Sequence, residues 1–268
     1  MTAGIPNQSE TSGQTVLYFH GLPGSAAELA SFGAAIAANA RHFHVVARGD
    51  ALAGGEPSGY FGRLAAQIER QWPDEPLHLV GFSLGAAAAL RVAPVLGARA
   101  RQIDLVAPAA PLSLGDFLDD MAGAPVFRAA RAGRATFAAL TQLQALAARF
   151  AMPRMAAALM ASARGGDAGL AADPLFLEQL AHSLRASLLT QRAAYQAELR
   201  LYVADWSADL AKLQQPVTIW QGSEDNWTPP AMAQALAAAL PAAAELRMQP
   251  GLSHFSTLRR YLETAIQP

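Results

Sequence analysis

The chain has 268 residues, a mass of 28.1 kDa, a formal net charge of -1 and an isoelectric point near 6.6. Hydrophobic residues make up 52% of it and charged residues 15%, which is typical of a compact globular protein. This charge balance provides neither a basic field for nucleic acid nor a polybasic face for anionic lipid, so we expect no nucleic-acid and no membrane partner. Because the chain has no cysteine, disulfides, thiolate catalysis and cysteine metal sites are excluded.

The first 14 residues are polar and lack the basic segment and apolar run of a signal peptide. The alanine-rich stretches, such as residues 155–163, are interrupted by arginine or proline before they reach membrane-spanning length. We therefore expect no transmembrane helix and a cytoplasmic protein.

Short apolar runs alternate with segments of helical periodicity in the first and last parts of the chain. The predicted strands cover 15–19, 43–47, a run that begins at Leu77, 103–107, 217–220 and 245–248. The predicted helices cover 26–40, 60–72, 84–96, 231–240 and 255–265. Such alternation favours right-handed crossovers, and the predicted fold class is α/β with a mostly parallel central sheet flanked by helices.

The alternation stops between residues 111 and 206, where apolar residues recur only at helical spacing. We predict an inserted all-helical cap, 111–206, between the two parts of a core formed by 1–110 and 207–268. Its large apolar side chains are expected to pack mainly between helices, with a few of them facing the pocket beneath. They are Met121, Phe127, Phe137, Met152, Met155, Met160 and Phe176.

The pattern Gly-x-Ser-x-Gly over residues 81–85 lies where the Leu77 strand turns into an alanine-rich helix. Such a turn pushes the side chain of Ser83 out of the sheet edge, and Gly81 and Gly85 remove the Cβ atoms that would collide there. The following helix directs free N–H groups toward whatever Ser83 attacks. Ser83 is therefore the candidate nucleophile, and the alternative is a tight turn with an incidental serine.

A serine hydroxyl needs a base within hydrogen-bonding reach, and that base needs an orienting carboxylate. Asp225 follows the predicted strand 217–220, and His254 follows the strand 245–248, so both are expected at the same sheet edge as Ser83. The alternative acid is Glu224. Among the other histidines, His20 is expected to shape its loop by hydrogen bonding.

These motifs, in the order Ser, acid, His, resemble those of the α/β-hydrolase family. The resemblance extends from Thr15 to Ile266 and rests on four motifs, which begin at His20, Gly81, Gly222 and Gly251. It implies an α/β-hydrolase fold in which Ser83 attacks, His254 transfers the proton and Asp225 holds the imidazole tautomer. It also implies an oxyanion hole formed by the backbone N–H groups of Leu22 and Leu84. Little chain precedes Thr15, so the sheet is expected to be short at that edge.

The leading functional hypothesis is a serine hydrolase that cleaves an ester, thioester or related acyl bond of a small, fairly apolar substrate through an acyl-enzyme. The alternatives are a carbon-carbon bond hydrolase or a menaquinone-pathway-type lyase with the same triad, an aminopeptidase relative, and a non-catalytic small-molecule binding protein of this fold. No cofactor is expected, because the sequence has neither metal-ligand spacing nor a phosphate-binding loop. The substrate and the oligomeric state stay open.

Overall fold

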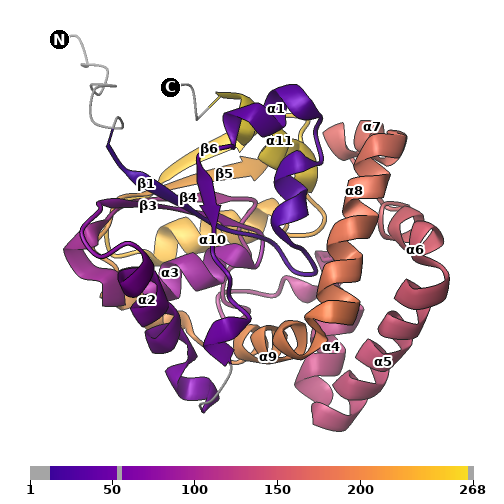
Figure 1. Cartoon of the computed structure of the whole chain (residues 1–268), viewed down its shortest axis with the longest axis horizontal. Coiled ribbons are helices and arrows are strands. Elements are labelled where there is room, and N and C mark those ends of the chain that lie inside the picture. Colours follow the sequence, from indigo (N-terminus) through magenta and orange to yellow (C-terminus); the bar gives the residue numbers. More distant parts are fainter. Residues whose placement is uncertain (1–12, 53–55, 265–268) are drawn as a thin grey trace.

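Six strands form a single parallel sheet in the order β2-β1-β3-β4-β5-β6 (Figure 1). The computed structural model describes residues 13–52 and 56–264. The strands are β1 (Thr15–Phe19), β2 (Phe43–Val45), β3 (Leu77–Phe82), β4 (Ala100–Val106), β5 (Val217–Gly222) and β6 (Glu245–Gln249). The predicted α/β class with a parallel central sheet is confirmed.

Helices cover both faces of the sheet because successive strand residues point to opposite sides. The helices of the sheet layer are α1 (Ala34–Asn39), α2 (Tyr60–Gln71), α3 (Gly85–Leu96), α10 (Pro230–Ala239) and α11 (His254–Thr264). Leu79 belongs to the core formed with α2, α3 and α10, whereas its neighbour Val80 belongs to the core formed with α1 and α11. Both strand residues are fully buried.

The single helix expected over 26–40 is wrong, because this segment is divided in two. A 3-10 turn occupies Ala26–Ala30, and α1 begins only at Ala34. Gly33, between them, has a φ of 89°, which is a conformation that ends a helix and favours glycine.

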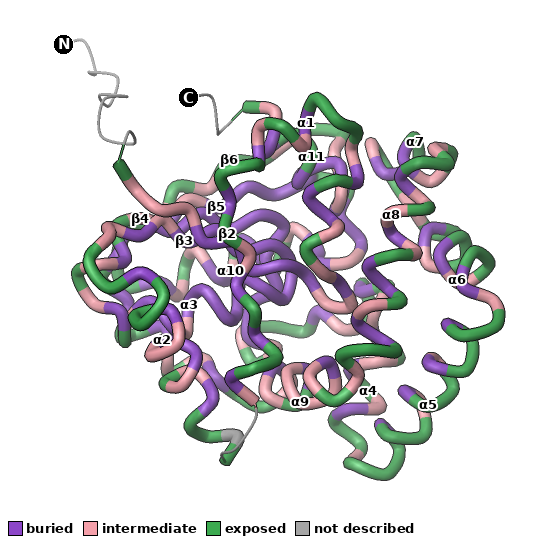
Figure 2. The backbone as a smooth tube through the Cα atoms, viewed as in Figure 1, coloured by how far each residue is buried: buried purple, intermediate pink, exposed green. Residues whose placement is uncertain are grey.

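Between β4 and β5 the described chain contains helices and no strand. The α-helices are α4 (Ala124–Ala132), α5 (Arg134–Phe150), α6 (Met152–Leu159), α7 (Gly166–Ala171), α8 (Pro174–Arg185) and α9 (Arg192–Val203). A π-helical turn, Ala186–Thr190, joins α8 to α9. We call the segment 111–206 the inserted helices; they lie together on one side of the sheet (Figure 1). Their buried stripes face inward and their other faces are exposed (Figure 2).

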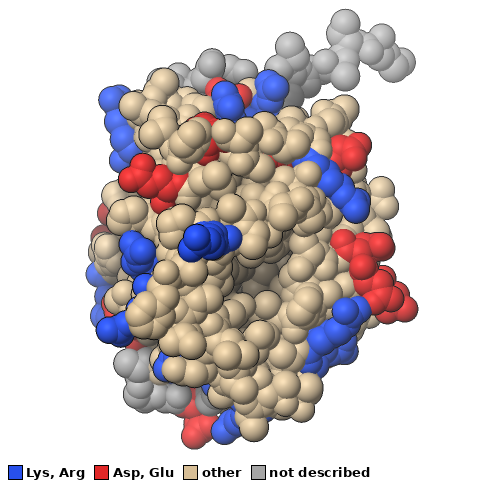
Figure 3. Space-filling model, turned by 90° about the vertical axis from the view of Figure 1, so that its right-hand side faces the viewer, with Lys and Arg blue, Asp and Glu red and all other residues tan. Residues whose placement is uncertain are grey.

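Most of the large apolar residues of the inserted helices are buried and pack into the main core, as expected. The outer side of these helices carries few charges near its centre, where the surface is hollowed (Figure 3). No helix in the described part of the chain combines the length and the hydropathy that a membrane span requires.

Candidate active site

Ser83 lies in the two-residue turn between β3 and α3, with a φ of 54°. Positive φ is rare and strained for a residue other than glycine, and such strain is concentrated at functional sites. The turn is anchored by the Ser83 N–H, which donates to the carbonyl of Val106 at 3.0 Å. A Cβ on Gly85 would lie 2.0 Å from the carbonyl oxygen of Phe19, and one on Gly81 would lie 2.6 Å from Cα of Ala86. The two glycines therefore allow the helix to start directly against the sheet.

A narrow pocket of about 100 Å³ opens over Ser83. Core loops provide part of its wall, with Leu22, Pro23, Leu84, Trp227 and Thr228. The inserted helices provide the rest, with Ala122, Gly123, Val126, Phe127, Gln144, Met155, Leu159, Leu184, Leu188, Tyr195 and Leu199. The wall is mainly apolar, so the sequence-based expectation that a few of the large apolar residues face a pocket holds for Phe127 and Met155.

The backbone N–H groups of Leu22 and Leu84 are without a protein acceptor in the described structure. Both residues line the pocket beside Ser83, and Leu84 immediately precedes α3. The first N–H groups of a helix have no partner inside the helix and carry its positive dipole end. Two donors thus remain available next to the Ser83 hydroxyl.

The loop that carries Leu22 is held from below by a buried carboxyl group. Oε1 of Glu28 accepts hydrogen bonds from the N–H of Gly21 at 2.9 Å and from the hydroxyl of Tyr18 at 2.8 Å. Burial raises the pKa of Glu28 to about 7. Nδ1 of His20 lies 3.1 Å from a guanidinium nitrogen of Arg48, and burial together with that charge lowers the pKa of His20 to about 3. His20 is therefore a neutral member of the loop.

Asp225 and His254 meet at the carboxyl ends of β5 and β6. Oδ2 of the buried Asp225 lies 2.9 Å from Nδ1 of the buried His254. The other carboxylate oxygen, Oδ1, accepts from the N–H groups of Trp227 at 2.8 Å and Thr228 at 2.9 Å. The Thr228 hydroxyl lies 3.0 Å from Oδ2. The neighbouring Glu224 is exposed and makes no hydrogen bond to an imidazole within the described residues, so the carboxylate at His254 is that of Asp225.

Ser83 and the imidazole are brought to the same side of the sheet without a hydrogen bond between them in the described chain. The ring of Phe82, which precedes Ser83, lies 4.8 Å from the ring of His254, measured between centroids. Thr228, whose Oγ1 is 3.2 Å from Nδ1 of His254, lines the same pocket as Ser83.

The comparison with protein families identifies the family of the fold. The sequence model of the alpha/beta hydrolase fold matches residues 14–256. The chain belongs to the alpha/beta hydrolase fold family. No curated protein gives a significant match to it.

Several solved structures share the fold of this alpha/beta hydrolase family member at low sequence identity. A bromoperoxidase from Bacillus anthracis is 15% identical with a TM-score of 0.63, and the match covers 94% of this chain and 88% of that one. The enol-lactonase from Burkholderia xenovorans LB400 is 16% identical with a TM-score of 0.61, covering 95% and 90%. A 2-hydroxy-6-oxo-6-phenylhexa-2,4-dienoate hydrolase from Rhodococcus sp. strain RHA1 is 19% identical with a TM-score of 0.61, covering 95% and 88%.

Other polar residues of this alpha/beta hydrolase fold lie outside the pocket or were not predicted. Asp104, a buried residue of β4, accepts a hydrogen bond from the hydroxyl of Tyr261 in α11 at 2.8 Å. Thr228 and Glu28 were missed, although Thr228 could have been found from the Asp-x-x-Thr spacing that lets an aspartate accept two following N–H groups. In the described part of the chain, no group of three histidine, aspartate or glutamate side chains could hold a metal ion.

Proposed function

We propose that this protein is a serine hydrolase that cleaves an ester, thioester or related acyl bond of a small, fairly apolar substrate. The observation that carries the proposal is the 2.9 Å contact between Asp225 and Nδ1 of His254, at the sheet edge where Ser83 occupies a strained turn. A carboxylate on Nδ1 leaves Nε2 of the imidazole as the nitrogen that can accept a proton.

In the proposed reaction, Oγ of Ser83 attacks the substrate carbonyl and its proton passes to Nε2 of His254. The backbone N–H groups of Leu22 and Leu84 stabilise the oxyanion of the tetrahedral intermediate. When the intermediate collapses, His254 donates that proton to the leaving alcohol or thiol, and an acyl-enzyme remains. A water molecule then attacks the acyl carbon, loses its proton to His254, and the carboxylic acid leaves as Ser83 regains the proton.

The pocket defines the proposed substrate class. Its wall of leucine, methionine, valine and phenylalanine suits a short apolar acyl group, and we propose that the inserted helices act as the cap that encloses it. A carbon-carbon bond hydrolase or a lyase with the same triad is the second candidate. It is favoured by the buried hydroxyl of Tyr195, which reaches Oε1 of Gln144 at 3.5 Å in the pocket wall and could bind a second substrate oxygen.

The proposal is tested with a fluorophosphonate probe and p-nitrophenyl esters of graded acyl length. The wild type should be labelled and should hydrolyse the esters, whereas Ser83→Ala should lose labelling and reduce kcat by about 10⁴-fold or more. Ser113→Ala, an exposed serine that bonds Asp205, is the matched control and should retain both properties. Failure of the folded wild type to label would overturn the proposal, and labelling without ester turnover would favour the carbon-carbon or lyase chemistry.

A further inference from the structure

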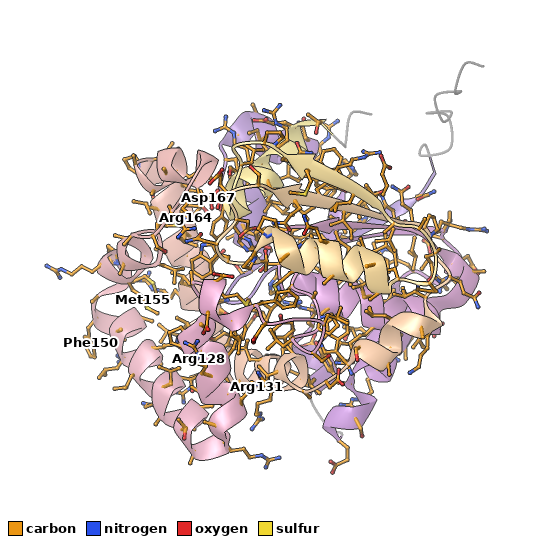
Figure 4. All side chains as sticks on the ribbon, turned by 180° about the vertical axis from the view of Figure 1, so that it is seen from behind. Arg128, Arg131, Phe150, Met155, Arg164 and Asp167 are labelled. Carbon is orange, nitrogen blue, oxygen red and sulfur yellow. The ribbon has the colours of Figure 1, made fainter. Side chains whose placement is uncertain are left out.

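The inserted helices reach across to the loop that carries His254. Asp167, in the first turn of α7, is fully buried although it belongs to a short surface segment of the insertion. Figure 4 shows Asp167 where α7 borders the C-terminal part of the core. A buried carboxylate requires compensating donors, and these come from the start of α11.

Three hydrogen bonds join Asp167 to the residues just after His254. Its carboxylate accepts from the N–H of Phe255 at 3.1 Å, from the N–H of Ser256 at 2.7 Å and from the hydroxyl of Ser256 at 2.6 Å. The N–H groups at these two helix positions are normally bonded by the side chain of the residue before the helix. That residue is Ser253, whose buried hydroxyl has no hydrogen-bond partner in the described structure. Asp167 therefore caps α11 from another part of the chain.

Two glycines allow this close approach. The N–H of Gly166 donates to the carbonyl of Gly251 at 2.8 Å, and Gly165 has a φ of 47°. A Cβ on Gly165 would lie 2.5 Å from the carbonyl oxygen of Gly251, and one on Gly166 would lie 2.7 Å from Cβ of Ser256. The segment 165–167 therefore packs closely against residues 251–256, which include His254.

We propose that Asp167 is a positioning residue for His254, so that the docking of α7 on α11 aligns the catalytic base; this rests on the proposed function. Asp167 acts through the N-terminal turn of α11 and touches neither the imidazole nor the substrate. The carboxylate also interacts electrostatically with the imidazole of His254, so it stabilises the positive charge that the ring gains during the proposed reaction. The other carboxyl groups that face His254 are Asp225, at the end of β5, and Glu28, beneath the Leu22 loop.

The acid loop is tied to the same insertion by an independent set of contacts. The carbonyl of Asn226, next to Asp225, accepts from the N–H of Ala122 at 2.7 Å. The amide of Asn226 donates to the carbonyl of Ser162 at 2.8 Å. The residues next to Asp225 and next to His254 are therefore both hydrogen-bonded to the inserted helices. The Ser83 turn, by contrast, is bonded to the neighbouring strand. Movement of the insertion would displace the Asp225–His254 pair relative to Ser83.

The test compares Asp167→Asn with Asp173→Asn. Asp173 caps α8 in the same insertion by accepting from the N–H of Leu175 at 2.9 Å, and in the described chain no hydrogen bond joins its side chain to residues 253–256. We expect Asp167→Asn to lower kcat for p-nitrophenyl butyrate by about 10- to 100-fold while KM changes by less than about threefold. The acidic limb of its kcat/KM profile should move to lower pH, because removal of a nearby negative charge disfavours the imidazolium. Asp173→Asn, whose amide oxygen can still cap α8, should show neither change.

Two further measurements keep the outcome decisive. Ser256→Ala retains the carboxylate but removes one of its donors, so it should lower kcat less than Asp167→Asn and leave the pH profile in place. If the wild type hydrolyses no ester, the proposed function fails. The positioning role of Asp167 is then tested by the NMR resonances of the His254 imidazole. These resonances should shift in Asp167→Asn and not in Asp173→Asn. An unchanged pH profile and unchanged imidazole resonances in Asp167→Asn, or equal kcat losses in both variants, would overturn the inference.

Discussion

Thr228 holds its hydroxyl 3.0 Å from Oδ2 of Asp225, the same carboxylate oxygen that lies 2.9 Å from Nδ1 of His254. The hydroxyl is also 3.0 Å from the carbonyl oxygen of Ala107 and 3.2 Å from Nδ1 of His254. One hydroxyl proton cannot serve every neighbour, and an ionised carboxylate is the strongest acceptor among them. We infer that Thr228 donates to Asp225 and fixes the orientation in which the carboxylate faces the imidazole.

The first prediction concerns Thr228→Val, which keeps the shape of the side chain and removes the hydroxyl. Asp225 retains the two backbone N–H donors on Oδ1 and the longer hydrogen bond from the Gln221 amide to Oδ2, at 3.4 Å, but it loses the hydroxyl donor on Oδ2, the oxygen that faces His254. A hydrogen bond to a charged group contributes about 1.5 to 3 kcal/mol, so kcat should fall by about 10- to 100-fold with little change in KM. The measurement is steady-state ester hydrolysis, with Thr264→Val, at the exposed end of α11, as the control. A kcat equal to that of the wild type would show that Asp225 is positioned without the Thr228 hydroxyl.

The second prediction concerns the close contact of α3 with β1. In Gly85→Ala the new Cβ would have to displace the carbonyl of Phe19, because it would lie only 2.0 Å from that oxygen. We expect the free energy of unfolding to fall by about 3 kcal/mol or more, through backbone displacement in a close-packed core. Urea denaturation provides the measurement. Gly62→Ala, at an exposed position in the first turn of α2 with nothing within 4 Å of its Cβ position, should instead stabilise the protein by about 0.5 to 1 kcal/mol.

The third prediction follows from Glu28, whose pKa burial raises from the ordinary 4.5 to about 7. Between these pH values the folded protein binds this proton more readily than the unfolded chain does, so stability decreases as pH rises. The contribution of this protonation to the free energy of unfolding is fully present below about pH 4.5 and is lost above about pH 7. At about 1.4 kcal/mol per pH unit, this contribution amounts to about 3 kcal/mol.

Glu28→Gln removes this titration while its carbonyl can still accept from Gly21 and Tyr18. The difference in free energy of unfolding between the wild type and this variant should therefore change by about 2 to 3 kcal/mol between pH 5 and pH 8, with the wild type relatively weaker at pH 8. Glu69→Gln, on the exposed side of α2, controls for the loss of a carboxylate. A difference that stays constant across this pH range would contradict a raised pKa at Glu28.

The strands and the turn at Ser83 could be predicted from the sequence because their signals are local. The run 15–19 has the composition of a buried strand, and glycines two residues on either side of Ser83 mark a turn that no other residues would allow. The division of the segment 26–40 could not be predicted, because alanine favours a helix on both sides of Gly33 and only the positive φ of that glycine ends it.

Asp167 shows why the rest of the site cannot be predicted from local sequence patterns. The sequence shows only that a helix is interrupted at Gly165 and Gly166. Nothing near these glycines indicates a contact with the residues around His254, almost 90 residues later in the chain. The contact depends on how α7 docks on α11, which is a tertiary property. By contrast, the position of Asp225 just after a strand, in a Gly-x-x-Asp spacing that begins at Gly222, is local, and it identified the carboxylate that meets His254.

The fourth prediction concerns the pocket over Ser83, whose wall includes the half-buried Val126 of α4. Val126→Phe adds a ring to a cavity of about 100 Å³ without replacing a fully buried core residue, so it should shorten the space available to the acyl chain. One methylene group more or fewer on a substrate in an apolar pocket changes the discrimination between two substrates by about 1 to 3 kcal/mol. We therefore expect kcat/KM to fall by about 10- to 100-fold for p-nitrophenyl hexanoate and by less than about threefold for the acetate. Val95→Phe, which adds the same ring at an exposed site on α3, should leave both values unchanged. An equal loss for the two esters in Val126→Phe would mean that the acyl chain does not extend along α4.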